Sequence, residues 1–206
     1  MSSTNRDVWL VSVNGGELKQ LTTNPAADEQ PEYSPDGKTI AVRAQRRAGF
    51  ESDRWYIDLY DVAGGTKRTL FAAFDKSADD FRWAPDGRSI WFTGADHGTE
   101  NLYSISLTES TPKLVAKGGA IGQFTNAGAF GIFAKSSLTA PTDIYRVSVA
   151  DGAVRQLTAE NAAWLRQVDM PDVSSATAPG QRARRFSIGY SSRLAFRRRR
   201  STRRCS

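Results

Sequence analysis

Apolar and polar residues alternate along four short segments of this chain, which is the period of a half-buried β-strand. The four segments are residues 7–13, 53–60, 100–107 and 142–149. The apolar anchors that align them are Trp9, Trp55, Leu102 and Ile144. These anchors lie 46, 47 and 42 residues apart. Such a regular spacing predicts an internal repeat.

Each segment continues into a short turn and a second strand, which predicts a hairpin that is used four times. Three of the turns contain glycine, at residues 14–16, 63–65 and 151–152, and the third repeat has residues 109–111 instead. Glycine supplies the positive φ that tight hairpin turns need.

A second hairpin recurs between the first ones and is marked by a Pro-Asp-Gly turn. The turn residues are Pro35, Asp36, Gly37, Pro85, Asp86 and Gly87. Proline presets the first φ, aspartate accepts local N–H groups and glycine takes the left-handed position. In the third repeat the signal weakens to residues 124–133, and no such hairpin follows the fourth. Two hairpins per repeat predict a four-stranded unit of about 40–50 residues, the size of a propeller blade.

The predicted fold class is therefore all-β: a partial β-propeller of about four four-stranded blades, with a disordered basic C-terminal tail. Blade repeats are expected near residues 7–50, 51–98, 99–137 and 138–173 of a propeller domain covering 1–173. A β-sandwich is the alternative, but sandwiches do not show two distinct turns at a fixed period. An open arc is favoured over a closed ring, and its exposed strand edges predict self-association.

Aromatic residues at strand spacing are expected in the core between adjacent blades, since large apolar side chains hold a propeller together. They are Trp9, Tyr33, Trp55, Phe81, Trp83, Trp91 and Phe92.

The charge divides the chain near residue 174. The whole chain has 28 basic and 22 acidic residues, a net charge of +6. Ten arginines and no acid fall in residues 174–206, which leaves 18 basic and 22 acidic residues, a net of −4, in residues 1–173. A uniformly basic domain is excluded, and the Arg/Ser-rich tail is expected to be disordered because like charges repel. The tail would bind phosphates by counterion release, but it lacks the interleaved aromatics of an RNA-binding segment.

Several kinds of chemistry are excluded by composition. His97 and Cys205 are the only histidine and cysteine, so a disulfide or a His/Cys metal cluster is not expected, and neither is a cofactor. His97 lies between two predicted strands and is expected at a loop tip. No run of about 18 apolar residues exists, so no membrane span is expected. Residues 1–7 lack the apolar stretch of a signal peptide, which predicts a cytoplasmic chain as written.

The turns at residues 34–37 and 84–87, each followed by an apolar strand, resemble the bacterial WD-type propeller repeat. This repeat occurs in the Tol-system periplasmic propeller protein and in the prolyl oligopeptidase family. Finer similarity, over roughly residues 5–173, is to bacterial acylaminoacyl-peptidase or dipeptidyl-peptidase-like members. The segments that carry it are residues 7–11 with 20–24, 46–55 and 163–171. The resemblance implies a propeller that caps an α/β-hydrolase domain with a Ser-Asp-His triad, in a parent that is often exported.

The sequence after Val173 does not resemble the α/β-hydrolase domain of that family. A nucleophilic serine needs a G-x-S-x-G turn, whereas residues 189–193 read Gly-Tyr-Ser-Ser-Arg, and no histidine follows His97. The chain is expected to be a truncated propeller that is not an enzyme alone, with an out-of-frame tail. In the parent it would gate peptide access to the missing hydrolase domain. A free-standing propeller that binds a protein, similar to the Tol-system protein, and nucleic-acid binding through the tail are the alternatives.

The loop of residues 43–54 carries the candidate substrate site. Its candidate residues are Arg46, Arg47, Phe50, Glu51, Asp53 and Arg54. The resemblance implies that charged propeller loops face the cavity between the two domains of the parent enzyme and contact its peptide substrate. A buried carboxylate such as Glu51 suits the N-terminal ammonium of a peptide. The alternative is a solvated loop whose ion pairs contribute under about 1 kcal/mol each.

Overall fold

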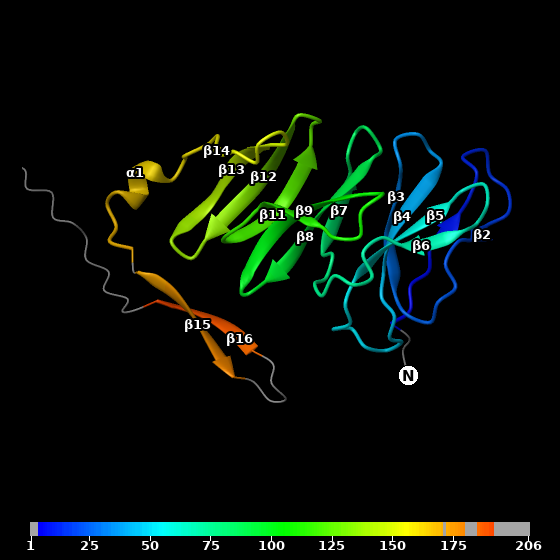
Figure 1. The fold of residues 1–206 in the computed structure, drawn as a ribbon, viewed down its shortest axis with the longest axis horizontal. Helices are drawn as coiled ribbons and strands as arrows, with labels where there is room; N and C mark the ends of the chain where they lie inside the picture. Colours follow the sequence, from blue (N-terminus) through cyan, green and yellow to red (C-terminus); the bar gives the residue numbers. More distant parts are fainter. Residues whose placement is uncertain (1–3, 171, 180–184, 192–206) are drawn as a thin grey trace, which may run out of the picture. The chain divides into compact units, whose positions relative to one another are not determined.

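The computed structural model describes residues 4–170, 172–179 and 185–191. Within these residues the regular structure is almost entirely β (Figure 1), and the one helix is α1 (Ala162–Leu165). No helix in this part of the chain is long and apolar enough to cross a bilayer. The all-β fold class predicted from the strand period is confirmed.

The described residues group into two compact units. The first unit runs up to Gly94 and includes Leu102–Val115 and Asn126–Gly128. The second unit contains Ala95–Asn101, Ala116–Thr125 and the described residues from Ala129 onward.

Three groups of four consecutive strands make up most of the fold (Figure 1). The first contains β3 (Asp28–Tyr33), β4 (Thr39–Ala44), β5 (Tyr56–Asp61) and β6 (Lys67–Thr69). The second contains β7 (Asp80–Trp83), β8 (Ser89–Asp96), β9 (Thr99–Ser106) and β10 (Lys113–Ala116). The third contains β11 (Ala120–Asn126), β12 (Phe130–Ser137), β13 (Ala140–Ser148) and β14 (Val154–Gln156). The first group is a separate sheet, whereas the second and third belong to one eight-stranded sheet, in which β9 and β11 pair in parallel at Glu100 and Ala120. Ahead of them, β1 (Trp9–Leu10) and β2 (Lys19–Gln20) form a two-stranded sheet.

These blades do not follow the expected boundaries near residues 7–50, 51–98, 99–137 and 138–173. Strands β4 and β5 pair along their whole length, so the loop of residues 45–55 joins two strands of one blade instead of separating two repeats. Each blade therefore starts with the Pro-Asp-Gly hairpin, or its weaker equivalent, and ends with the other hairpin. By the same order, β1 and β2 correspond to the last two strands of a blade.

Both Pro-Asp-Gly turns join the first two strands of a blade. Gly37 and Gly87 have φ of +71° and +67°, in the left-handed region that favours glycine. The Asp36 carboxylate accepts the Ser34 hydroxyl at 2.6 Å and the backbone N–H of Lys38 at 3.1 Å. Local side-chain bonds of this kind stabilise tight turns.

One hydrogen bond recurs in the last hairpin of the repeats and shows which residues are equivalent. It runs from the N–H of Leu21 to Val8 O (2.9 Å), of Leu70 to Ile57 O (2.9 Å) and of Leu157 to Ile144 O (2.7 Å). The residues equivalent to Ile144 are therefore Val8 and Ile57, and not Trp9 and Trp55 as the sequence pattern suggested.

The aromatic core of the first unit is centred on Phe92. The Phe92 ring stacks on Phe71, with ring centroids 4.7 Å apart, and on Tyr103, with centroids 5.4 Å apart. Phe81, Trp83 and Trp91 are buried, as expected for core residues. The core prediction is wrong for Trp9 and Tyr33, which are half exposed, and Trp55 is only partly buried.

The described part of the expected tail contains a hairpin of β15 (Val173–Pro179) and β16 (Arg185–Ser191). This differs from the expectation that regular structure ends at residue 174, and the alternation of Phe186, Ile188 and Tyr190 has the strand period. Residues 180–184 and 192–206 lie outside the described residues. They include Cys205 and every tail arginine except Arg185, so the disorder and nucleic-acid interpretations stay predictions.

Candidate functional site

The loop between β4 and β5 is closed by its own polar groups. The Asp53 carboxylate accepts the backbone N–H groups of Arg46 at 2.8 Å and Arg47 at 2.9 Å. Burial would raise the pKa of Asp53, but these N–H donors hold it below its usual value. Buried Gln45 donates its amide N–H groups to the carbonyls of Glu51 at 3.1 Å and Asp53 at 3.0 Å. The loop backbone is therefore held by four bonds, which fix the directions of its side chains.

Arg46 points into the first blade, where its guanidinium meets the fully buried Asp58. The two side chains form a bidentate pair with N–O distances of 2.9 and 2.6 Å. Asp58 also accepts Lys67 Nζ at 2.8 Å and the Thr69 hydroxyl at 2.7 Å. Burial would raise the pKa of Asp58, but the bonds from these three partners keep it below its ordinary value. Arg46 is thus a structural residue that neutralises a buried carboxylate.

The other two arginines of the loop are also occupied within the first unit. Arg54 donates to the carbonyls of Ala72, at 3.0 Å, and Phe74, which ties the loop to the connection between β6 and β7. Arg47 lies 4.2 Å from the centroid of the exposed Phe50 ring. This pair packs at the loop surface and does not line the pocket described next.

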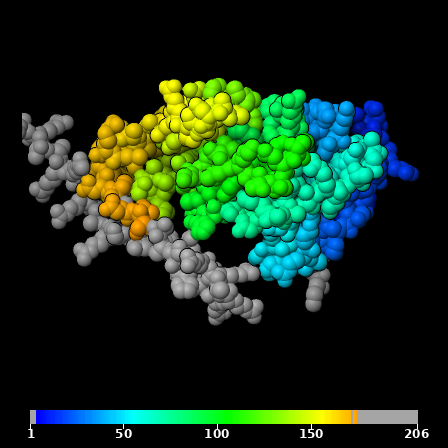
Figure 2. All heavy atoms as spheres, in the orientation of Figure 1, coloured from blue at the N-terminus to red at the C-terminus, as the bar shows by residue number. Residues whose placement is uncertain are grey.

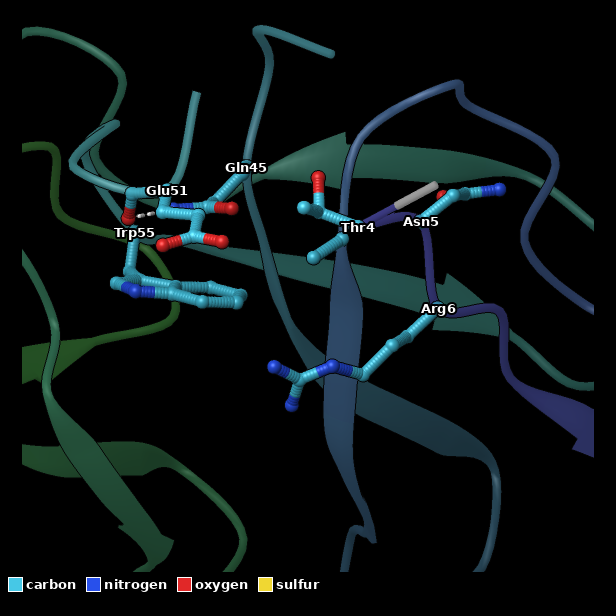
Figure 3. Close-up of a pocket in the computed structure, with 7 residues that line it drawn as sticks. Thr4, Asn5, Arg6, Gln45, Glu51 and Trp55 are labelled. Atoms are coloured by element: carbon cyan, nitrogen blue, oxygen red, sulfur yellow. Dashed lines mark hydrogen bonds between the residues drawn. The ribbon is translucent and has the colours of Figure 1, made fainter. Parts of the chain in front are cut away.

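Glu51 is a predicted site residue that lines a pocket of the first unit, with a volume of about 460 Å³ (Figure 3). The residues around it are Thr4, Asn5, Arg6, Ala27, Gln45, Glu51 and Trp55. In Figure 3 the Glu51 carboxylate lies over the Trp55 ring, and the Arg6 side chain points toward Trp55 from the opposite side. Glu51 is exposed at the rim of this pocket and not buried as expected, because it lies in the loop beyond the end of β4.

The pocket combines groups that suit a small cation. Arg6 forms an ion pair with Glu29, whereas the Glu51 carboxylate has no ion-pair partner among the described residues. The amide N–H groups of Gln45 bond to the loop, which leaves its carbonyl oxygen as an acceptor. The Arg43 guanidinium lies 4.4 Å from the centroid of the Trp55 ring and packs against it. Arg43 thus already supplies a cation to the Trp55 ring, and the groups that an ammonium could bond to are the two acceptors, the Glu51 carboxylate and the Gln45 carbonyl oxygen.

Sequence reasoning missed Gln45, Trp55 and Arg6 as pocket residues. Gln45 lies within the predicted loop of residues 43–54 but carries no charge that would single it out, and Trp55 directly follows the loop, where its strand spacing predicts a core residue. Arg6 comes from a segment far away in sequence, which only tertiary structure brings to the loop.

His97 lies at a hairpin tip, as the sequence predicts. No group of three or more His, Cys, Asp or Glu side chains in the described part of the chain is arranged to hold a metal ion. His97 occupies the turn between β8 and β9 with φ of +48°, and its Nδ1 lies 2.5 Å from Asp96 Oδ1. The two residues are adjacent in the sequence and the imidazole is exposed, so this contact is local to the turn.

Solved structures of similar fold include peptidases and the TolB protein. TolB from Acinetobacter baumannii matches 75% of this chain and 38% of its own, with a TM-score of 0.57 and 24% identity. Pyrococcus horikoshii acylaminoacyl peptidase matches 83% of this chain and 26% of its own, with a TM-score of 0.66 and 22% identity. The β-propeller domain of the Trilobed protease from Pyrococcus furiosus, described as having an open velcro topology, matches 75% of this chain and 46% of its own. Its TM-score is 0.57 and its identity 19%. These similarities show that the fold is a β-propeller.

In fold and in sequence the chain is similar to the β-propeller part of prolyl-oligopeptidase-like peptidases. The sequence relatives are dipeptidyl-peptidase 5 of Porphyromonas gingivalis, 31% identical over 165 residues, and of Porphyromonas endodontalis, 31% identical over 169 residues. The matches cover 79% and 81% of this chain but 24% of each relative, so the chain spans about a quarter of their length. No protein-family model matches the chain.

Proposed function

We propose that this chain serves as the propeller part of a serine peptidase, and that the pocket beside Glu51 holds the free amino terminus of a peptide. The observation that carries the proposal is the Glu51 carboxylate, without an ion-pair partner among the described residues, beside the Trp55 ring and the Gln45 carbonyl oxygen. An enzyme that releases dipeptides, as the name of the relatives says, must locate the amino end of its substrate. A carboxylate that accepts hydrogen bonds from an ammonium group meets this need.

In the parent enzyme, the propeller would also restrict access to the catalytic serine of a separate hydrolase domain. A propeller loop that binds a free α-amino group admits extended chain ends and disfavours folded proteins, whose termini seldom reach into a pocket. Gating and amino-terminal recognition would then be two effects of one domain.

Binding of a dipeptide amide tests the pocket directly. Glycyl-phenylalanine amide is expected to shift the indole N–H signal of Trp55 in NMR spectra of the full chain, and its N-acetyl derivative is expected not to. Glu51→Gln should weaken binding about tenfold or more, because a hydrogen bond to a charged group contributes about 1.5–3 kcal/mol.

The matched control is Glu109→Gln, which removes an exposed acid that pairs with Lys113 at 2.9 Å, away from the pocket. This variant should bind like the unsubstituted chain. Equal binding of the free and the acetylated peptide, or no loss in Glu51→Gln, would refute the amino-terminus site.

Hydrolysis of dipeptidyl p-nitroanilides by the chain alone is expected to stay at the buffer rate. No histidine follows His97, so a serine beyond it has no base in the order that α/β-hydrolases use. Release of p-nitroaniline measures the rate, with Ser191→Ala as the control. Activity that Ser191→Ala abolishes would contradict the expectation.

A further inference from the structure

The pocket beside Glu51 is lined by one charged side chain of each sign, Glu51 and Arg6, and both are exposed. The loop of residues 45–55, which carries Glu51, lies at the surface of the first unit, in light blue in Figure 2. The remaining lining residues are uncharged: Thr4, Asn5, Ala27, Gln45 and Trp55. The pocket is therefore dipolar, and both of its charged groups are open to solvent.

These two charges do not neutralise each other. Arg6 forms an ion pair with Glu29, and Glu51 has no ion-pair partner among the described residues. In Figure 3 the Glu51 carboxylate and the Arg6 side chain approach the Trp55 ring from opposite sides. An ammonium group alone can meet only Glu51, whereas a ligand that carries both an ammonium and a carboxylate can meet both charged groups.

Arg6 can bind a second anion without giving up Glu29. Its pair with Glu29 uses one terminal nitrogen of the guanidinium, which leaves the donors on the other nitrogens for a ligand. The Arg6 side chain is 67% exposed, so these donors can be reached from solvent. Glu29 is also paired with Arg43, at 3.4 Å, and keeps this cationic partner when Arg6 turns toward a ligand.

Arg43 is not the cation that a ligand in this pocket would meet. Its guanidinium packs on the Trp55 ring, 4.4 Å from the centroid, and its side chain is 14% exposed. It is not among the residues that line the pocket. Arg6 is therefore the charged group that can distinguish one peptide end from another.

We propose that the pocket selects peptides whose first residue is aspartate or glutamate, with the α-ammonium at Glu51 and the side-chain carboxylate at Arg6. This inference rests on the proposed function, because it uses the same ammonium site. A peptide substrate continues beyond its second residue, so its C-terminal carboxylate lies far from its amino end. The carboxylate that accompanies the ammonium into the pocket must then belong to a side chain, and a guanidinium is well suited to bind it.

Two dipeptide amides that differ in this carboxylate test the inference. Aspartyl-phenylalanine amide and asparaginyl-phenylalanine amide have nearly the same size, and at about pH 6 both amino groups are protonated. The aspartyl peptide is expected to bind the full chain about three- to fivefold more tightly, which is the effect of an exposed ion pair. Titration of the Trp55 indole N–H signal by NMR measures both dissociation constants.

Variants of Arg6 show whether this side chain is responsible. Arg6→Gln should bind the two peptides equally, whereas Arg6→Lys keeps the charge and should keep part of the preference. The matched control is Lys113→Gln, which removes a similarly exposed cation that pairs with Glu109 at 2.9 Å, away from the pocket. This variant should retain the full preference. Circular-dichroism melting checks that the variants fold, and Arg6→Gln leaves Glu29 paired with Arg43.

The outcomes separate this inference from the proposed function. Suppose that glycyl-phenylalanine amide binds through its amino group but the aspartyl peptide binds no more tightly than the asparaginyl peptide. The preference for an acidic first residue is then wrong, while the ammonium site stands. A preference that persists in Arg6→Gln would assign the carboxylate to another cation and overturn the role of Arg6. If no peptide with a free amino group binds, both proposals fail.

Discussion

Asp58→Ala is expected to lower the free energy of unfolding by about 3 kcal/mol, as removing one partner of a buried ion pair costs about 3–5 kcal/mol. The Asp58 side chain is fully buried and accepts bonds from Arg46, Lys67 and Thr69. Its removal leaves two cations without their counter-charge and the Thr69 hydroxyl without its acceptor. The expected cost lies at the lower end because both cationic side chains are about one-third exposed and reach water. Urea unfolding followed by circular dichroism measures it.

The matched control is the exposed ion pair of Asp75 with Lys76, at 2.9 Å. Asp75→Ala should change stability by less than about 0.5 kcal/mol, because surface ion pairs contribute little. Asp58→Asn keeps the side-chain volume and one acceptor, and should fall between the two alanine variants. If Asp58→Ala costs no more than Asp75→Ala, the network does not stabilise the blade.

The pH dependence of unfolding gives a second measurement of the same network. The pKa of Asp58 is lower in the folded chain than the ordinary value of about 3.9. The stability contributed by Asp58 is therefore fully present above that ordinary value and is lost as the pH falls through the folded pKa. Asp58→Asn should flatten the acid side of the stability curve below about pH 5. Asp75→Asn, at an exposed site, should leave most of that slope in place.

Strand type and turn chemistry were predictable because both are local. The period of two and the Pro-Asp-Gly and glycine turns act within about ten residues, and they indicated the hairpins that the structure shows. Which hairpins join into a blade depends on pairing between β4 and β5 across the loop of residues 45–55. That pairing joins strands on either side of a long loop, so no local pattern indicates it. The sequence therefore predicts a blade boundary near residue 50, inside what is one blade in the structure.

The candidate site was predicted in part for a similar reason. The charged loop and Glu51 were visible in the sequence, but the role of Arg46 depends on Asp58, which lies in the next strand. An aspartate inside the apolar strand of residues 56–61 is the signal that could have indicated a buried ion pair. In the sequence repeat, Trp9 and Trp55 align because they are the same residue type. The backbone hydrogen bonds show that Val8 and Ile57 are the equivalent positions.

A second large effect is expected at Gly119, directly before β11. Its φ of +74° lies in the left-handed region, and an added Cβ would meet the carbonyl oxygen of Ser136 at 2.1 Å. The Ser136 oxygen belongs to the backbone, so it cannot rotate away as a side chain could. The Gly119 carbonyl accepts the N–H of Glu100 at 3.0 Å, which holds the Gly119 backbone in place as well. Gly119→Ala therefore combines conformational strain, about 1–2 kcal/mol, with a contact that only a backbone shift relieves. A loss of more than about 2 kcal/mol is expected.

Two neighbouring glycines separate these contributions. Gly118 has φ of +87° with open space around its Cβ position, so Gly118→Ala should show the conformational cost alone. Gly122 has neither a positive φ nor a close neighbour, and Gly122→Ala should be neutral or stabilise by about 0.5–1 kcal/mol. Thermal unfolding should rank the losses as Gly119, then Gly118, then Gly122. Equal losses at Gly118 and Gly119 would show that Ser136 moves aside, and that the close approach of Gly119 to the end of β12 is not rigid.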